Sequence, residues 1–150
     1  MPRFTAVTRP TVQSSGGNTV SMLVGSSAGR GAVRSLFFSV EGAPADLNIT
    51  WKLDRFTAGS SQSSAFTNIG YGDPADAGNS RITVRQNATV EPTYASAVVF
   101  QGTVNTRMPY RMDWPPDTFR ISTASGNGVG LLANATASGQ VLNVGWDWDE

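Results

Sequence analysis

The chain has 150 residues, of which 11 are basic and 11 acidic, so its formal charge is zero. It contains no His and no Cys, which excludes the commonest acid–base group, the commonest metal ligand, the strongest side-chain nucleophile and a disulfide-stapled scaffold. No run of like charges indicates a nucleic-acid or anionic-membrane partner. Length and composition therefore favour one domain, residues 1–150, with a scaffold or binding role rather than a catalytic one.

The first part of the chain alternates apolar and polar residues, which predicts strands with one buried face. The clearest case is the segment 47–56, where Ile49, Trp51 and Leu53 point to the same side. Residues 1–18 are interpreted either as an extended N-terminal arm or as an edge strand. The other extended segments predicted here are residues 4–12, 19–24 and 32–40.

The remainder of the chain repeats this pattern after a long excursion. Residues 57–80 are rich in Ser, Gly, Ala and Asp, and such a long loop in a compact domain is often functional or an interface. About nine or ten strands with no helical period predict an all-β, single-domain antiparallel β-sandwich, jelly-roll-like rather than a closed barrel. The later strands are predicted at residues 81–85, 94–104, 107–114, 118–123, 129–134 and 140–148.

Candidate catalytic groups are few. Asp113 and Asp117 flank a Trp-Pro-Pro sequence and resemble a glycosidase carboxylate pair, but the prolines favour a turn-capping role. Lys52 is the one unconventional base available to a hydroxyl nucleophile, and it lies on the polar side of its strand. We therefore expect no catalytic residues, and a hydrolase is the third-ranked alternative.

Acidic clusters offer two candidate calcium sites, one at Asp147, Asp149 and Glu150 and one at Asp73 and Asp76. Neither has the ligand number or spacing of a known calcium loop, so no metal and no cofactor are expected. Asn-x-Thr triplets resemble glycosylation acceptors, but a Thr-rich chain produces them by chance, and no signal peptide or membrane span is predicted. The triplets begin at Asn48, Asn87 and Asn134.

The tryptophans admit two interpretations. With the tyrosines they could form a sugar-stacking face, which is the main binding-module alternative. Trp51 and Trp114 lie on the apolar sides of their strands, which favours the core. Trp146 and Trp148 alternate with acidic residues in the last predicted strand, which favours the edge of the core, with an intersubunit patch as the alternative.

Four segments, in their order along the chain, resemble a family of small, β-rich virion-type proteins of tailed bacteriophages and prophages. The resemblance extends from Leu36 to the C-terminus, and its most specific element is the Glu-Pro-Thr-Tyr turn. It implies a β-rich structural component and transfers no catalytic or ligand residue. The segments are residues 47–59, the Asp-Pro-Ala-Asp loop at 73–76, the Glu-Pro-Thr-Tyr turn at 91–94 and the Asn-Gly hairpin at 125–131.

From this resemblance we expect a non-enzymatic capsid decoration or cement protein, made in the host bacterial cytoplasm and bound to the outer surface of the phage head. Its expected partners are the major capsid protein and copies of itself, as a homotrimer or another cyclic oligomer, with no contact to nucleic acid or membrane. The alternative is a tail- or fibre-associated module that binds carbohydrate through loops such as residues 57–80. Candidate subunit or capsid contacts are Phe4, Arg9, Arg30 and Arg34.

Overall fold

The alternating segments form strands in the computed structural model of the chain, and none of the described residues lies in a helix. The described part of the chain therefore contains no helix that could span a membrane. The strands are β1 (Arg3–Thr8), β2 (Thr11–Val12), β3 (Asn18–Val24), β4 (Ala32–Val40), β5 (Asn48–Ala58), β6 (Ser64–Phe66), β7 (Gly70–Tyr71), β8 (Thr83–Gln86), β9 (Thr93–Tyr94), β10 (Phe100–Asn105), β11 (Tyr110–Asp113), β12 (Phe119–Arg120), β13 (Gly128–Ala135) and β14 (Gln140–Asp149). The structure describes residues 2–12, 18–27, 30–41, 46–58, 64–66, 70–71, 80–95, 98–121, 124–135 and 139–150.

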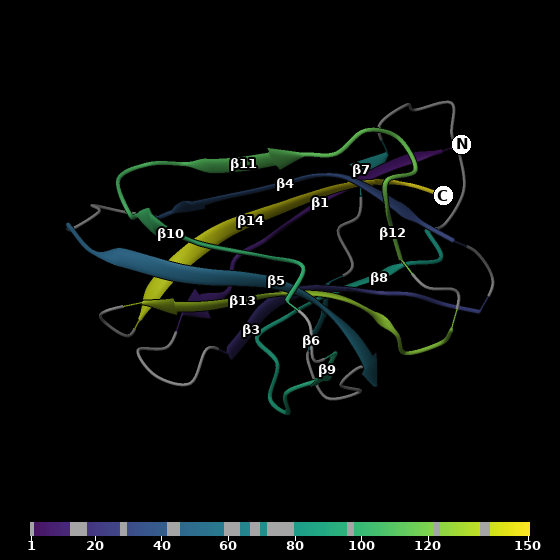
Figure 1. The fold of residues 1–150 in the computed structure, drawn as a ribbon, viewed down its shortest axis with the longest axis horizontal. Coiled ribbons are helices and arrows are strands. Elements are labelled where there is room, and N and C mark those ends of the chain that lie inside the picture. Colours follow the sequence, from purple (N-terminus) through teal and green to yellow (C-terminus); the bar gives the residue numbers. More distant parts are fainter. Residues whose placement is uncertain are drawn as a thin grey trace.

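Two antiparallel sheets face one another (Figure 1). One has the order β11-β4-β14-β1-β7, and the other has the order β10-β5-β13-β3-β8-β6. Without the short additions, these orders are β1-β14-β4-β11 and β3-β13-β5-β10. Successive strands of this set change sheet, except from β5 to β10, which is the jelly-roll pattern of two Greek keys. The predicted all-β, jelly-roll-like sandwich is confirmed.

The core lies between the sheets and is organised by β14. Its inward residues Leu142, Val144, Trp146 and Trp148 are all fully buried, as the alternation predicts. The indole N–H of Trp146 donates to the hydroxyl of Ser21 on the opposite sheet at 2.9 Å. Burial of these side chains ties β14 to both layers of the sandwich.

The N-terminal segment is part of this sandwich. All six residues of β1 pair with β14, and the neighbouring β7 pairs with β1 at Phe4 and Thr5. The extended-arm interpretation is therefore wrong for the segment 3–12, whose β2 also pairs with β14. Phe4 is only 2% exposed and stacks on Trp148 with ring centroids 5.8 Å apart, so its assignment as a partner contact is corrected to a core residue.

One predicted strand is interrupted in the structure. The segment 94–104 divides into β9 and β10, which pair with different parts of β5. β11 and β12 likewise pair with successive parts of β4, and Trp114 between them turns into the core against Phe119. β6 and β7 lie within the predicted loop 57–80 and are too short to leave a periodic signal. Residues 59–63, 67–69 and 72–79 of that loop lie outside the described residues.

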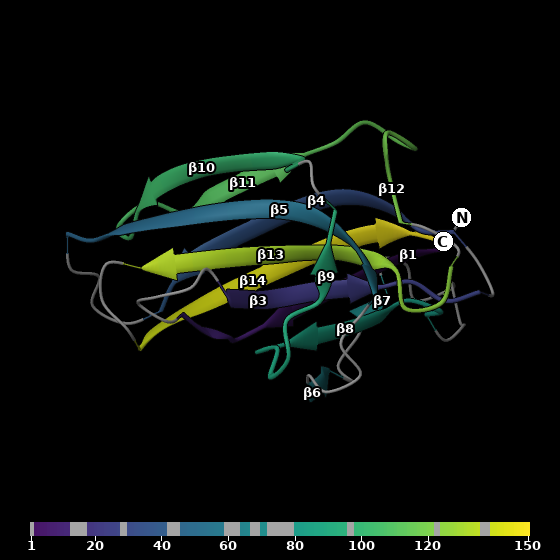
Figure 2. The same ribbon diagram turned by 60° about the horizontal axis from the view of Figure 1, so that its bottom comes forward.

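Residues 87–95, which we call the strap, cross the outer face of the second sheet from β8 to β5 (Figure 2). Their backbone is anchored where the amide of Ala88 donates to the carbonyl of Thr19 on β3 at 3.1 Å. Tyr94 then packs above Gly130 on β13, where a Cβ atom would lie 2.4 Å from the phenol oxygen. A glycine at this position allows the strap to approach the sheet closely.

The Glu-Pro-Thr-Tyr turn forms the centre of the strap. The Glu91 carboxylate accepts hydrogen bonds from the backbone amide of Thr19 at 3.0 and 3.1 Å and from its hydroxyl, which also contacts the phenol of Tyr94. Pro92 between them is buried. Burial raises the pKa of Tyr94 well above its usual range, which keeps the phenol neutral. The most specific element of the resemblance therefore holds the strap on the sheet.

We expect Phe4→Ala to lower the free energy of unfolding by about 3–5 kcal/mol, because it removes a buried ring from the core. The matched control is Val7→Thr in the same strand, where the side chain is 43% exposed and the change should stay within about 0.5 kcal/mol. Urea unfolding followed by circular dichroism gives both values. Equal effects of the two variants would contradict the placement of β1 inside the sandwich.

The contacts of the strap predict that substitutions at Thr19 and Tyr94 have coupled effects on the free energy of unfolding. Thr19→Val should lower the free energy of unfolding by about 1–3 kcal/mol, because it leaves the partly buried Tyr94 phenol and Glu91 carboxylate short of a partner. Adding Tyr94→Phe should cost less than in the wild-type background, since the hydroxyl contact is already lost. Thr50→Val, at an exposed position on β5, is the matched control. Strictly additive effects, measured by denaturant unfolding, would show that the contact does not hold the strap.

Candidate protein-binding face

The strand register places two rows of side chains across the outer face of the sheet β11-β4-β14-β1. One row runs Arg111, Phe37, Gly145 and Val7. In the neighbouring row, each residue is two positions from the residue of the first row on the same strand. This row runs Asp113, Ser35, Asp147 and Thr5. These residues alternate with the buried core residues of the same strands, so packing of the core determines which side chains reach this face.

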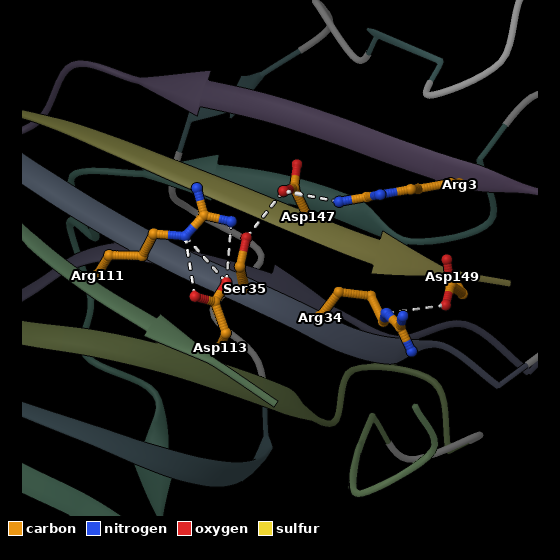
Figure 3. Close-up of polar contacts among 7 residues, drawn as sticks. All are labelled: Arg3, Arg34, Ser35, Arg111, Asp113, Asp147 and Asp149. Atoms are coloured by element: carbon orange, nitrogen blue, oxygen red, sulfur yellow. Dashed lines mark hydrogen bonds and ion pairs between the residues drawn. The ribbon is translucent and has the colours of Figure 1, made fainter. Parts of the chain in front are cut away.

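Arginine–aspartate pairs cover much of the face (Figure 3). The Nε of Arg111 lies 2.9 and 3.0 Å from the two carboxylate oxygens of Asp113. Arg3 Nη2 lies 3.3 Å from Asp147 Oδ2, and the hydroxyl of Ser35 donates to the same oxygen at 2.8 Å. The contacts of Asp147 with Ser35 and Arg3 connect β4, β14 and β1, and the Arg111–Asp113 pair lies within the neighbouring β11.

A β-bulge adds the third pair. The register between β4 and β14 shifts at Asp147 and Trp148, so Ser35 pairs with Asp147 and Val33 pairs with Trp148. Arg34 is the extra residue, and its Nε reaches Asp149 Oδ2 at 3.3 Å. The bulge thus brings Arg34 and Ser35 to one face although they are adjacent in the sequence (Figure 3).

The apolar centre of the face is the ring of Phe37. It lies over Gly145, where a Cβ atom would be only 1.9 Å from the ring. Val7, which pairs with Gly145 on the other side, is 43% exposed. The face therefore combines an apolar centre with charged groups of both signs.

The electrostatics of the face are balanced. Hydrogen bonds from the Arg111 guanidinium hold the pKa of Asp113 below its usual range, so this carboxylate is ionised at neutral pH. Arg111 and Asp113 are each 60% exposed, and exposed pairs of this kind contribute little to stability. They can exchange partners with charges on a docking surface at little cost to the fold, and Arg is suited to such contacts.

The four predicted contact residues do not come together. Arg34 lies on this face, whereas Phe4 is in the core. Arg9 follows β1 and pairs with Glu41, beyond the end of β4, while Arg30 precedes the start of β4. The nine residues of β4 separate those two arginines by roughly 30 Å.

The candidate catalytic and metal-binding residues have separate partners. Asp113 pairs with Arg111, and Asp117 pairs with Arg120 at 3.5 Å. The carboxylate of Glu150 accepts hydrogen bonds from residues 80–82 and from the indole of Trp148. Within the described residues, no three or more Asp, Glu, His or Cys side chains are grouped to hold a metal ion, and the Asp73 and Asp76 candidates lie outside them.

The tryptophans form no sugar-stacking surface. Trp51 and Trp114 are 3% and 9% exposed, and Trp146 and Trp148 are fully buried, so the core interpretation is confirmed for all four. Lys52 is exposed on the opposite sheet, as its polar position predicts.

Sequence reasoning missed the face as a unit. Alternation in the last strand sets Asp147 and Asp149 opposite the tryptophans, and the same signal is present at Arg111 and Asp113. It does not reveal that Arg3, from the other end of the chain, lies beside them, because that depends on strand order.

Comparison of the chain with protein-family models, with curated proteins and with solved structures finds no match.

We expect Arg111→Gln to raise the pKa of Asp113 toward its ordinary value, because the hydrogen bonds that favour the carboxylate are lost. In the wild type the folded-state pKa lies below the unfolded one. The pair therefore stabilises the fold above the unfolded pKa, and this contribution is lost as the pH falls through the folded pKa. The variant should show a weaker acid dependence. Carboxyl carbon NMR titration measures the shift directly.

The control for this titration is Arg107→Gln, which removes an equally exposed guanidinium that pairs with Asp46 at 3.0 Å. It should leave the pKa of Asp113 unchanged. An unaltered Asp113 titration in Arg111→Gln would show that the pair does not form in solution.

Proposed function

We propose that this protein is a non-enzymatic structural protein of a tailed-phage virion that decorates the capsid shell and stabilises the head. The observation that carries the proposal is the outer face of β11-β4-β14-β1, with Phe37 lying over Gly145 among paired arginines and aspartates. A charge-balanced surface with an aromatic centre suits a protein partner better than nucleic acid, for which a basic surface is expected.

Two further considerations support the virion role. The segments from Leu36 onward resemble small virion-type proteins, and the Glu-Pro-Thr-Tyr turn at their centre holds the strap on the sandwich. Jelly rolls also occur in viral capsid domains, although a fold by itself does not determine a function. The face is proposed to bind the major capsid protein, with further contacts between copies in a cyclic oligomer.

Multivalency explains how a face with weak affinity in a single subunit could hold the protein on a capsid shell. Exposed ion pairs and one aromatic side chain provide weak affinity for a single subunit. When an oligomer engages several identical sites on a shell, each further contact forms at high effective concentration, so the assembly dissociates slowly.

The test is quantitative mass spectrometry of purified virions that carry the wild-type protein, Arg111→Glu or Arg107→Glu. Wild-type copy number should be near that of the major capsid protein, or a simple fraction of it. Arg111→Glu, which reverses a charge on the face, should reduce this number at least tenfold, while Arg107→Glu should leave it unchanged. The two arginines are matched, with side chains 60% and 59% exposed.

Circular dichroism establishes that both variants are folded. Complete absence of the wild-type protein from virions would overturn the structural role, and a handful of copies would place it on the tail or at a vertex instead. Equal incorporation of Arg111→Glu and Arg107→Glu would overturn the assignment of the face.

A further inference from the structure

A pocket of about 310 Å³ lies at the end of the sandwich where β4 begins, away from the centre of the charged face. It is formed where the segment before β4 meets β12. Its lining residues are Arg30, Gly31, Ala32, Asp117 and Arg120.

Backbone contacts hold the two walls together. The amide of Ile121 donates to the carbonyl of Gly31 at 2.7 Å, and Arg120 pairs with Ala32 in the strand register. Arg55 on the other sheet donates from Nη1 to the carbonyl of Arg120 at 2.6 Å, and its guanidinium lies 4.8 Å from the ring centroid of Phe119. The pocket is therefore built on paired strands.

Asp117 lines the pocket and has an unusual backbone conformation. It follows Pro115 and Pro116 and has a φ of 61°, which is uncommon for a residue other than glycine. Its backbone carbonyl accepts from Arg120 Nε at 3.2 Å, and its Oδ1 lies 3.5 Å from Arg120 Nη2. Asp117 therefore orients the Arg120 guanidinium, although the long carboxylate contact leaves this guanidinium incompletely paired.

The pocket is electropositive in a protein of zero formal charge. Two guanidinium groups line it, from Arg30 and Arg120, against the single carboxylate of Asp117. Outside the lining, Arg55 adds a positive charge behind the Arg120 backbone, and the Arg34–Asp149 pair beside Ala32 adds no net charge. Arg30 is exposed and forms no ion pair with any residue that the structure describes.

We propose that this pocket binds a carboxylate group of a partner protein, an Asp or Glu side chain, through Arg30 and Arg120. The planar guanidinium matches a carboxylate in a two-point contact. One excess positive charge among the lining residues suits a monoanion, whereas the retained Asp117 carboxylate repels a phosphate dianion. The pocket extends the interaction surface beyond the face of β11-β4-β14-β1, to which the proposed function assigns the main contact.

The test is an NMR titration of the isotopically labelled full-length protein with the peptide acetyl-Gly-Glu-Gly-amide. Its Gln counterpart and inorganic phosphate at equal ionic strength are the comparison ligands. Saturable shifts at the side chains of Arg30 and Arg120 and at the amides of Gly31 and Ala32 are expected with the Glu peptide only. A single carboxylate should bind with a dissociation constant on the order of 1 mM.

Substitutions of single arginines test whether Arg30 and Arg120 bind the carboxylate. Arg30→Gln and Arg120→Gln should each weaken binding at least tenfold, whereas Arg107→Gln, with the same charge change at the other end of the sandwich, should leave it unchanged. Arg30→Lys, which keeps the charge without the planar fork, should bind with intermediate affinity. Because Arg30 is exposed, its variants test the pocket even if Arg120→Gln alters the fold.

The proposal is overturned if the Gln peptide binds equally well, if phosphate binds more tightly than the Glu peptide, or if Arg30→Gln binds like the wild type. No capsid is present in this titration. A titration without binding would contradict the carboxylate site but not the proposed virion role. Absence of the protein from virions would contradict the virion role but not the carboxylate site.

Discussion

Burial of the inward side chains of β14 is the constraint on which the rest of the structure depends. Trp146 and Trp148 are fully buried between the sheets, and the Trp146 indole is hydrogen-bonded across the core to Ser21. Since side chains alternate along a strand, this placement directs Asp147 and Asp149 outward. A slip of one residue would expose both indoles and bury both carboxylates, so the register is strongly determined. The charged face is thus the reverse side of the core.

Two departures from regular sheet geometry shape the surfaces. The bulge at Arg34 gives the outer face an arginine that regular alternation would have directed inward, and it pairs with Asp149. The strap instead covers the outer face of the opposite sheet, where Gly130 leaves room for Tyr94. One sheet is therefore covered by a segment of the chain, while the other presents paired charges on its outer face.

The charged face is informative because it contributes little to folding. Exposed pairs such as that of Arg111 and Asp113 add little stability, whereas burial of the apolar core, which includes Phe4 and the tryptophans of β14, drives folding. Side chains that the fold does not require are available for recognition. The proposed face and the Arg30 pocket both use arginines in this way, at different places on the sandwich.

The sequence by itself determined the all-β class, the positions of the main strands and the core positions of Trp51 and Trp114, because alternation is a local property of each strand. It also placed Asp147 and Asp149 opposite Trp146 and Trp148. Only the tertiary structure decided that β1 lies beside β14, which made Phe4 a core residue and Arg3 a partner of Asp147. Likewise, neither the bulge at Arg34 nor the crossing of the strap has a local periodic signal. Strand order depends on contacts between residues more than a hundred positions apart, and these are set by the packing of the whole core rather than by any single segment.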